Sequence, residues 1–199
     1  MNIFVFNECP VENARQYCNR HLVKMITEHV QMMTTVCAEA EPLKFEAIPP
    51  KLRMKPFKEG DPHRKHPCTL WLFKSQTNYD YLWALNMFLH EEWRYRYDHP
   101  KTKIHEAYRK MLHLPDILID DVGLTPFAQA MPEKYQQEDV FKAYQEYFMG
   151  EKMHIAHWKK REEPEWFFLR RTHRSISSIV SFILRQGNET YEAFRKELK

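Results

Sequence analysis

Glycine is scarce in this chain, and its scarcity restricts the folds that the chain can adopt. Only four of the 199 residues are glycine. Glycine supplies the positive φ angles of tight turns and the close backbone approach of phosphate-binding loops. The sequence therefore argues against a turn-rich β fold. It also contains no P-loop, GxGxxG, GxSxG, HExxH or CxxC motif, which argues against the common nucleotide hydrolases, dinucleotide oxidoreductases and nucleophile-elbow hydrolases. We predict an all-α protein.

The bulk composition indicates a folded protein outside the membrane. Hydrophobic residues make up 43% of the chain and charged residues 29%, a balance that excludes a disordered polymer. No apolar run approaches the about 20 residues of a membrane span, and residues 1–10 lack the pattern of a signal peptide. Four irregularly spaced cysteines fit reduced thiols better than a disulfide framework. We expect a cytoplasmic protein that does not bind membranes.

The prolines mark the expected helices. Pro10 suits a first helical position and no proline follows until Pro42, so the apolar spacing between them predicts one long helix over 11–40. The apolar residues 2–6 predict a short strand-like segment, either a strand or an extended plug. Further helices are expected within 67–75, 78–97, 104–114, 139–161, 175–187 and 189–199.

Two long loops interrupt this pattern, at 41–66 and 120–137. The first contains five prolines, which argue against a regular helix there, and its seven Lys and Arg against four Asp and Glu give it a net charge of +3. Loops of this length within one compact domain are often functional. We expect both loops to frame the opening of a cleft.

One side of the long helix carries a polar stripe. His21, Lys24, Glu28 and Gln31 lie within about 80° of one another at about 100° per residue, between the core face and the solvent face. A proton acceptor, a cation and a carboxylate on successive turns can orient a substrate and move a proton. The alternative is a Lys–Glu pair beside a histidine on a solvated edge.

A second group surrounds His66. His63, His66 and Cys68 have metal-binding side chains, but their spacing matches no common structural zinc site. We expect neither a metal nor another cofactor. His66 instead precedes a predicted helix, and a helix N-terminus at the mouth of a cleft suits a phosphate.

The remaining candidates lie on the segments 90–98 and 150–174. Glu91 beside Arg94 and Arg96 offers a carboxylate next to phosphate-binding guanidinium groups, although simple intrahelical pairs are the alternative. Tyr95 and Trp71 are candidates for stacking on a base. Lys152 and Arg161 belong to a basic segment that suits an anionic polymer or forms a solvated basic tail.

Several segments resemble a family of small proteins of tailed bacteriophages and related viruses. The similarity covers residues 1–168, and residues 169–199 look like a C-terminal helical extension. The most specific segments are IFVFNECPVENARQYCNRHLVKMITEHVQMMTT, HPCTLWLFKSQTNYDYL, HEEWRYRYDHPKTKIHEA, LTPFAQAMPEKY and AYQEYFMGEKMHIAHWKKREEPEWF. The family usually has an Asp-Lys pair where this chain has Asn19-Arg20. This difference puts in doubt any role for an acidic side chain next to His21.

The resemblance implies a function in phage DNA modification. The family is associated with enzymes that hypermodify DNA pyrimidines, in particular the proposed amino acid:DNA transferases. Such an enzyme would work in the cytoplasm of the infected bacterium, where an amine or amino acid displaces phosphate from an activated 5-hydroxymethylpyrimidine of DNA or of a nucleotide. The expected catalytic residues are His21, Lys24, Glu28 and Glu91. The expected substrate- and phosphate-binding residues are Gln31, His66, Trp71, Arg94, Tyr95, Arg96, Lys152 and Arg161.

Two other function classes fit the same residues. A non-catalytic phage protein that binds a nucleotide or a phosphorylated small molecule, for example to blunt a host defence, needs the basic and aromatic side chains but no base. A host-takeover interaction protein would need neither. The sequence leaves the oligomeric state undetermined.

Overall fold

The computed structural model describes residues 2–173 and 177. The contacts divide the chain into two units, residues 1–162 and residues 163–199. In the second unit, residues 165–173 are helical, and Glu163 forms an ion pair with Arg171. The predicted helices at 175–187 and 189–199 lie outside the described residues, apart from residue 177. The family domain predicted for 1–168 extends slightly beyond the first unit.

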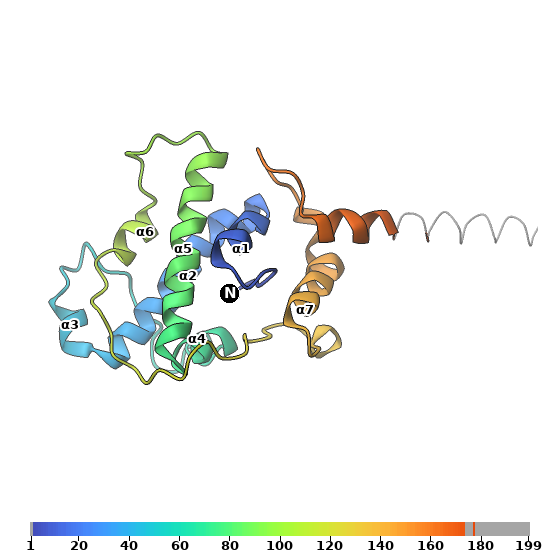
Figure 1. Ribbon diagram of the computed structural model, residues 1–199. Helices are drawn as coiled ribbons and strands as arrows, with labels where there is room; N and C mark the ends of the chain where they lie inside the picture. Colours follow the sequence, from blue (N-terminus) through green and yellow to red (C-terminus); the bar gives the residue numbers. More distant parts are fainter. Residues whose placement is uncertain (1, 174–176, 178–199) are drawn as a thin grey trace, which may run out of the picture. The chain divides into compact units, whose positions relative to one another are not determined.

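All regular structure among the described residues is helical, and no strand occurs there, which confirms the all-α prediction (Figure 1). The α-helices of the first unit are α1 (Pro10–Gln16), α2 (Asn19–Ala40), α3 (Pro42–Ala47), α4 (Pro67–Leu72), α5 (Gln76–Arg96), α6 (Glu106–Met111) and α7 (Val140–Tyr147). Short turns of 3-10 or π type occur before α7 at η1 (Glu133–Tyr135) and after it at η2 (Phe148–Lys152) and η3 (Met153–Ile155).

The helix expected over 11–40 is two helices, so the prediction of one continuous helix was wrong. Tyr17 and Cys18 adopt extended backbone angles between α1 and α2. The main chain at this break bonds to distant residues, since the Asn19 N–H donates to the His157 carbonyl oxygen at 2.8 Å. The break lets both helices pack against α5. Tertiary contacts therefore override the local helical pattern.

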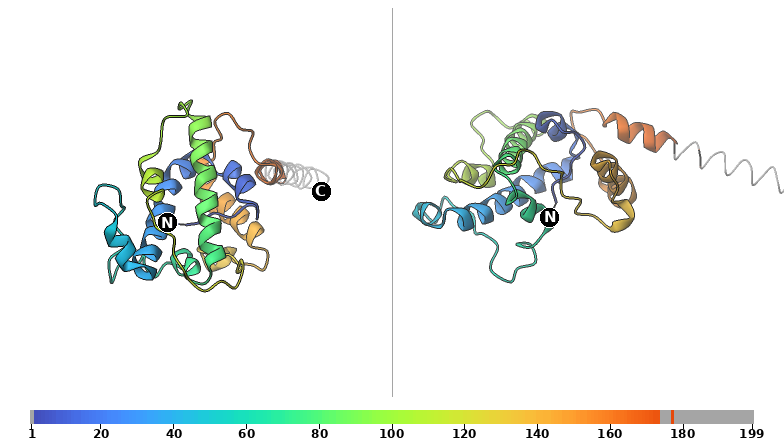
Figure 2. Two further views of the ribbon diagram at one scale, coloured as in Figure 1. Left: turned by 60° about the vertical axis from the view of Figure 1, so that its left-hand side comes forward. Right: turned by 60° about the horizontal axis from the view of Figure 1, so that its bottom comes forward.

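The first predicted loop contains a short helix that the prolines seemed to exclude. Pro42 occupies the first turn of α3, where the missing N–H has no intrahelical partner to lose, and the helix ends before Pro49 and Pro50. Residues 48–66 then form an irregular segment that leads to α4 (Figure 2). The second loop, 120–137, has only the single turn η1.

Residues 2–6 form an extended plug rather than a strand. All five are buried, and side-chain hydrogen bonds hold the main chain at Phe4 and Phe6. Asn13 accepts a hydrogen bond from the Phe6 N–H at 2.9 Å and donates to the Phe4 carbonyl oxygen at 3.1 Å. The Tyr17 hydroxyl donates to the same carbonyl at 2.8 Å. The segment thus passes through the helical core without a neighbouring strand.

The core of the first unit lies between α2 and the helices packed on it. Leu22, Ile26 and Met33 of α2 and Leu82 and Leu85 of α5 are fully buried. Burial of a side chain of this size contributes about 1.5–3 kcal/mol. This packing fixes one face of α2 and leaves the edge that carries Lys24 and Glu28 at the surface of the core.

Candidate functional site

A cavity of about 390 Å³ lies between α2 and the irregular segment before α4. Glu28 and Gln31 of α2 form one wall, as the polar stripe predicts. The basic loop supplies the other wall, so the structure brings together two features that are far apart in the sequence. The loop residues at the cavity are Lys55, Pro56, Phe57, Lys58, Asp61 and His63.

Glu28 is held at the edge of this cavity by Lys24. The Lys24 ammonium lies 3.1 Å from the Glu28 Oε1, one helical turn away. The two side chains differ in exposure, with 61% for Lys24 and 16% for Glu28. The carboxylate is therefore largely shielded, while its partner cation faces solvent. Both the catalytic prediction and the plain Lys–Glu pair are compatible with this geometry.

Hydrogen bonds and a ring contact fix the loop wall. The Phe57 N–H donates to the Thr35 Oγ1 at 3.0 Å, and this hydroxyl donates to the Gln31 carbonyl oxygen at 2.9 Å. Asp61 accepts from the His63 N–H at 2.8 Å, and hydrogen bonding by His63 lowers the pKa of that carboxyl. The rings of Phe57 and His63 stack with centroids 5.4 Å apart. The wall is thus formed without a ligand.

The cavity combines charges of both signs. Its lining includes the cationic side chains of Lys55 and Lys58 and the carboxylates of Glu28 and Asp61. Ammonium groups of this kind bind phosphate oxygens, and a shielded carboxylate next to them can accept a proton. The volume of the cavity, about 390 Å³, lies within the range of small-molecule sites. The arrangement can hold a phosphorylated ligand beside a general base.

His21 and Lys152 lie apart from the cavity lining. His21 stacks on Phe4 with ring centroids 4.1 Å apart and contacts Phe148 edge-on. Burial lowers the pKa of His21 to about 3, and the charges of Lys152 and Lys24 act in the same direction. The imidazole is therefore neutral near pH 7. Its Nδ1 is buried without a hydrogen-bond partner among the described residues.

His66 caps a helix near Glu28. Its Nδ1 accepts a hydrogen bond from the Cys68 N–H at 3.2 Å, at the start of α4. Burial lowers the pKa of His66, whereas the charge of Glu28 raises it. His66 therefore lies within electrostatic range of Glu28, but one ring nitrogen is already used as a cap. Its predicted phosphate contact would have to use the other ring nitrogen.

Glu91 and Arg94 form their own pair on α5 and do not line the cavity. The Arg94 guanidinium donates to both carboxylate oxygens of Glu91 and to the Lys101 carbonyl oxygen. This is the intrahelical pairing that stood as the alternative to a phosphate site. The structure thus separates Glu91 from Glu28 as a candidate base.

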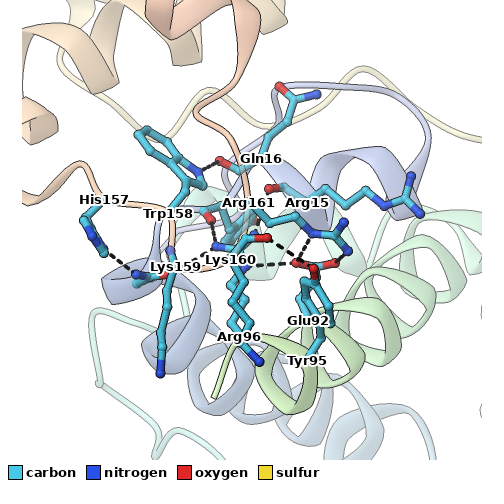
Figure 3. A network of polar contacts seen from close by, with 12 residues as sticks. Arg15, Gln16, Glu92, Tyr95, Arg96, His157, Trp158, Lys159, Lys160 and Arg161 are labelled. Carbon is cyan, nitrogen blue, oxygen red and sulfur yellow. Dashed lines mark hydrogen bonds and ion pairs between the residues drawn. The ribbon is translucent and has the colours of Figure 1, made fainter. Parts of the chain in front are cut away.

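Arg96 is part of the protein interior, and its assignment to phosphate binding was wrong. Its side chain is 0% exposed. The guanidinium donates to the carbonyl oxygens of Tyr17 and Arg15 at 2.7 and 2.8 Å, and to Glu92 at 2.9 Å (Figure 3). It also reaches the Asn19 side chain at 3.3 Å. These bonds satisfy carbonyls left open where α1 ends, so no guanidinium surface remains for a ligand.

Arg161 and Tyr95 complete the same network at its surface. Arg161 donates to the Glu92 carboxylate at 2.5 and 3.2 Å, so that Glu92 lies between two guanidinium groups (Figure 3). The Arg161 guanidinium lies 4.4 Å from the centre of the Tyr95 ring. Hydrogen bonds from Arg161 and Arg96 outweigh burial and lower the pKa of Glu92. Arg161 and Tyr95 thus stabilise the surface around α5 and do not line the cavity.

Trp71 is a core residue, so its proposed stacking on a base was also wrong. The side chain is buried, and its Nε1–H donates to the Thr125 carbonyl oxygen at 3.4 Å. One face of the indole stacks on Phe127, with centroids 5.3 Å apart. Among the residues of the cavity itself, Phe57 has the stacking surface that the sequence assigned to Trp71.

A larger cavity of about 860 Å³ adjoins the first along the loop. Lys55 and Pro56 line both. Its other walls come from α2, α3, the loop and Lys110 of α6, with Arg53 placed 5.4 Å above the ring of Phe45. The charge pattern of the sequence marks the basic loop as a whole but does not single out Arg53, Lys55, Phe57 or Lys58. The sequence feature that could have indicated these residues is the high density of positive charge between prolines.

No group of three or more His, Cys, Asp or Glu side chains among the described residues is placed to hold a metal ion. No helix in that part of the chain has the length and apolar character needed to cross a membrane. Comparison with protein-family models, curated proteins and solved structures finds no match to the chain.

Proposed function

We propose that the chain is a phage transferase that joins an amine or amino acid to an activated 5-hydroxymethylpyrimidine of DNA. The observation that carries this proposal is the position of Glu28, a shielded carboxylate at the wall of a cavity that also holds Lys55 and Lys58. The resemblance to the phage family supplies the substrate class. The protein would act in the cytoplasm of the infected bacterium, on DNA or on a nucleotide.

The chemistry assigns separate tasks to the two walls. Glu28 accepts a proton from the incoming ammonium, which frees the nitrogen lone pair. The amine then attacks the methylene carbon at pyrimidine C5, a C–N bond forms, and the C–O bond to the leaving phosphate breaks with its electrons on oxygen. Lys55 and Lys58 neutralise the charge of that phosphate.

The size of the cavity fits this substrate. A volume of about 390 Å³ accepts one nucleotide base with its activated substituent, rather than a duplex. A base within DNA would have to leave the stack to enter, as in other enzymes that modify bases. The Phe57 ring, stacked on His63 at the wall, offers an aromatic surface to a base.

A second function is favoured by the Lys24–Glu28 ion pair. The Glu28 carboxylate lies 3.1 Å from the Lys24 ammonium, and such a pair can serve as a plain intrahelical ion pair without a part in proton transfer. This observation suits a non-catalytic protein that captures a nucleotide or a phosphorylated small molecule. Lys55 and Lys58 would bind the phosphate in such a protein, and no side chain would need to accept a proton.

The test is intact nucleoside mass analysis of DNA that carries 5-phosphomethyl- or 5-pyrophosphomethyl-uracil, after incubation with the protein and mixed amino acids. A new adduct mass supports the transferase and identifies its amine. Lys24→Ala and Lys55→Ala should reduce the adduct, whereas the exposed control Lys142→Ala should not. Binding of the DNA without any adduct would favour the capture protein.

A further inference from the structure

One segment of the basic loop forms a wall of both the smaller cavity at Glu28 and the larger cavity beside it. Residues 53–56 line the cavity of about 860 Å³, and residues 55–58 line the cavity of about 390 Å³. Lys55 and Pro56 therefore lie where the two cavities adjoin. The five peptide steps of this segment span up to about 17 Å, several times the spacing of about 3.4 Å between phosphates in a stacked strand. The shared wall thus extends beyond a single nucleotide.

The larger cavity has an excess of positive charge. Its lining includes the cations Arg53, Lys55 and Lys110 and a single carboxylate, that of Glu46. Arg53 and Lys55 belong to the loop and Lys110 to α6, so two separate parts of the chain supply the charge. Among the described residues, neither Arg53 nor Lys55 has an acidic partner within ion-pair distance. The cavity therefore favours an anionic ligand.

The third cation, Lys110, shares its acidic partner with a stronger competitor. The Lys110 ammonium lies 3.6 Å from the Glu106 Oε1, whereas the Arg109 guanidinium binds both oxygens of that carboxylate at 2.8 to 3.1 Å. Glu106 does not line the cavity, and its side chain is 62% exposed against 24% for Lys110. The Lys110 ammonium can therefore contact a second anion within the cavity.

Apolar side chains form the rest of the lining. They are Ala38, Pro42, Phe45, Pro50, Met54 and Pro56. The Arg53 guanidinium lies 5.4 Å above the ring of Phe45, a position favoured by cation–π attraction. A guanidinium on a ring still has N–H donors along its edge, and these suit phosphate oxygens. Cations for the phosphates beside an apolar surface for the sugars and bases are the features with which proteins bind single strands.

Hydrogen bonds at both ends of the shared wall hold it in place without a ligand. The Phe57 N–H donates to the Thr35 Oγ1 at 3.0 Å, which ties one end to α2. At the other end, the Leu52 N–H donates to the Pro49 carbonyl oxygen at 2.8 Å and closes a turn. A wall that is already positioned reduces the ordering cost of binding.

We propose that the larger cavity binds the nucleotide next to the reacting pyrimidine in a single strand of DNA. The phosphate between the two nucleotides would contact Lys55, and the phosphate on the far side would contact Arg53 and Lys110. This inference rests on the proposed function, which places the pyrimidine in the cavity at Glu28. It specifies the substrate as a single-stranded segment of DNA rather than a free nucleotide.

The test compares the binding of thymidine 5′-monophosphate and of trithymidylate to the full chain, by isothermal titration calorimetry at low salt. Neither ligand carries the leaving group of the proposed reaction, so the affinity is measured without transfer. We expect trithymidylate to bind about tenfold more tightly or better, because its further phosphates reach Arg53 and Lys110. Equal affinities would overturn the proposal and leave the proposed transfer to a free nucleotide intact.

Variants assign the added affinity to the larger cavity. Arg53→Ala and Lys110→Ala should each weaken trithymidylate binding about three- to tenfold and lower its salt slope by about 0.7, while the affinity for the monophosphate stays unchanged. Lys51→Ala removes an exposed cation of the same loop outside both cavities and is the matched control. Glu46→Gln removes the carboxylate of the cavity and should tighten trithymidylate binding about two- to threefold, a gain that misfolding cannot produce.

Two further results would contradict the proposal. Parallel losses for both ligands in Arg53→Ala and Lys110→Ala would show that the larger cavity holds no separate nucleotide. Binding of hexaglutamate as tight as that of trithymidylate would assign the larger cavity to an acidic peptide. Failure of the proposed transfer is measured separately, as a missing adduct mass, and would leave the dependence of affinity on strand length in place.

Discussion

The Lys24 ammonium and the Glu28 carboxylate lie 3.1 Å apart on α2, and the lysine is on the solvent side of the pair. The carboxylate lines the cavity, and its counter-ion is the more exposed of the two groups. A ligand phosphate that enters meets Lys55 and Lys58 on the opposite wall. In the proposed reaction, this division of charge would separate the group that takes a proton from the groups that hold the phosphate.

The loop cations should determine the affinity for phosphate. Lys55→Ala and Lys58→Ala each remove one ammonium from the cavity wall and should each weaken binding of a pyrimidine nucleotide about three- to tenfold at low salt, as expected for a partly solvated ion contact of about 1 kcal/mol. Isothermal titration calorimetry measures this change. Lys142→Ala, on α7, is the matched control. Unchanged affinity in both loop variants would show that phosphate does not bind there.

The buried guanidinium of Arg96 should matter for folding. Arg96→Leu leaves Glu92 and two carbonyl groups without that donor, and should lower the free energy of unfolding by about 3–5 kcal/mol. Arg94→Ala removes a surface pair and should cost about 1 kcal/mol or less. Urea denaturation compares the two variants. Equal losses would contradict the structural role of Arg96.

Acid should destabilise the fold through buried histidines. Burial lowers the pKa of His21 and of His29 to about 3, below the ordinary value of 6.5, so the unfolded chain binds more protons. Their contribution is complete above pH 6.5 and is lost as the pH falls toward 3. At pH 5.5 each histidine should cost about 1.4 kcal/mol.

Denaturation at several pH values tests this origin. His21→Phe keeps a ring on Phe4 and should reduce the loss between pH 7 and 5.5 by about half. The exposed His113 is a suitable control, since His113→Gln should leave the slope unchanged. A slope that persists in full in His21→Phe would assign the effect to other groups.

Asn13 should hold the plug in place. Asn13→Ala removes the side-chain acceptor of the Phe6 N–H and one of the two side-chain donors to the Phe4 carbonyl oxygen, and should lower the free energy of unfolding by about 1–3 kcal/mol. Hydrogen exchange at the Phe6 amide should accelerate in this variant. An amide that stays protected would show that packing alone holds residues 2–6.

The sequence predicts where helices lie better than it predicts where a helix is broken. The apolar spacing of α2 and α5 is visible because one face of each helix is buried. The break at Tyr17 and Cys18 has no such signal, since it is stabilised by Arg96 and by the His157 carbonyl from far along the chain. At Pro42 the sequence-based prediction failed in the opposite way. The prolines of the loop were expected to exclude a helix, but a proline in the first turn of a helix is favourable, and Pro42 begins α3.

The residues around the candidate cavity were predicted in part for similar reasons. Helix geometry correctly placed Lys24, Glu28 and Gln31 on one edge of α2. Residue type alone suggested Arg96 and Trp71, yet both are buried, and burial depends on contacts that the local sequence does not contain. The basic loop was recognisable by charge, but which of its lysines line the cavity depends on how it packs on α2.

The most direct test of the central claim is the Glu28→Gln variant, measured for both transfer and binding in one preparation. The account predicts that DNA with 5-phosphomethyluracil yields no amine adduct with this variant, while its affinity for the pyrimidine nucleotide is at least that of the unsubstituted protein. An adduct formed at an unchanged rate would contradict the role of Glu28 as the base.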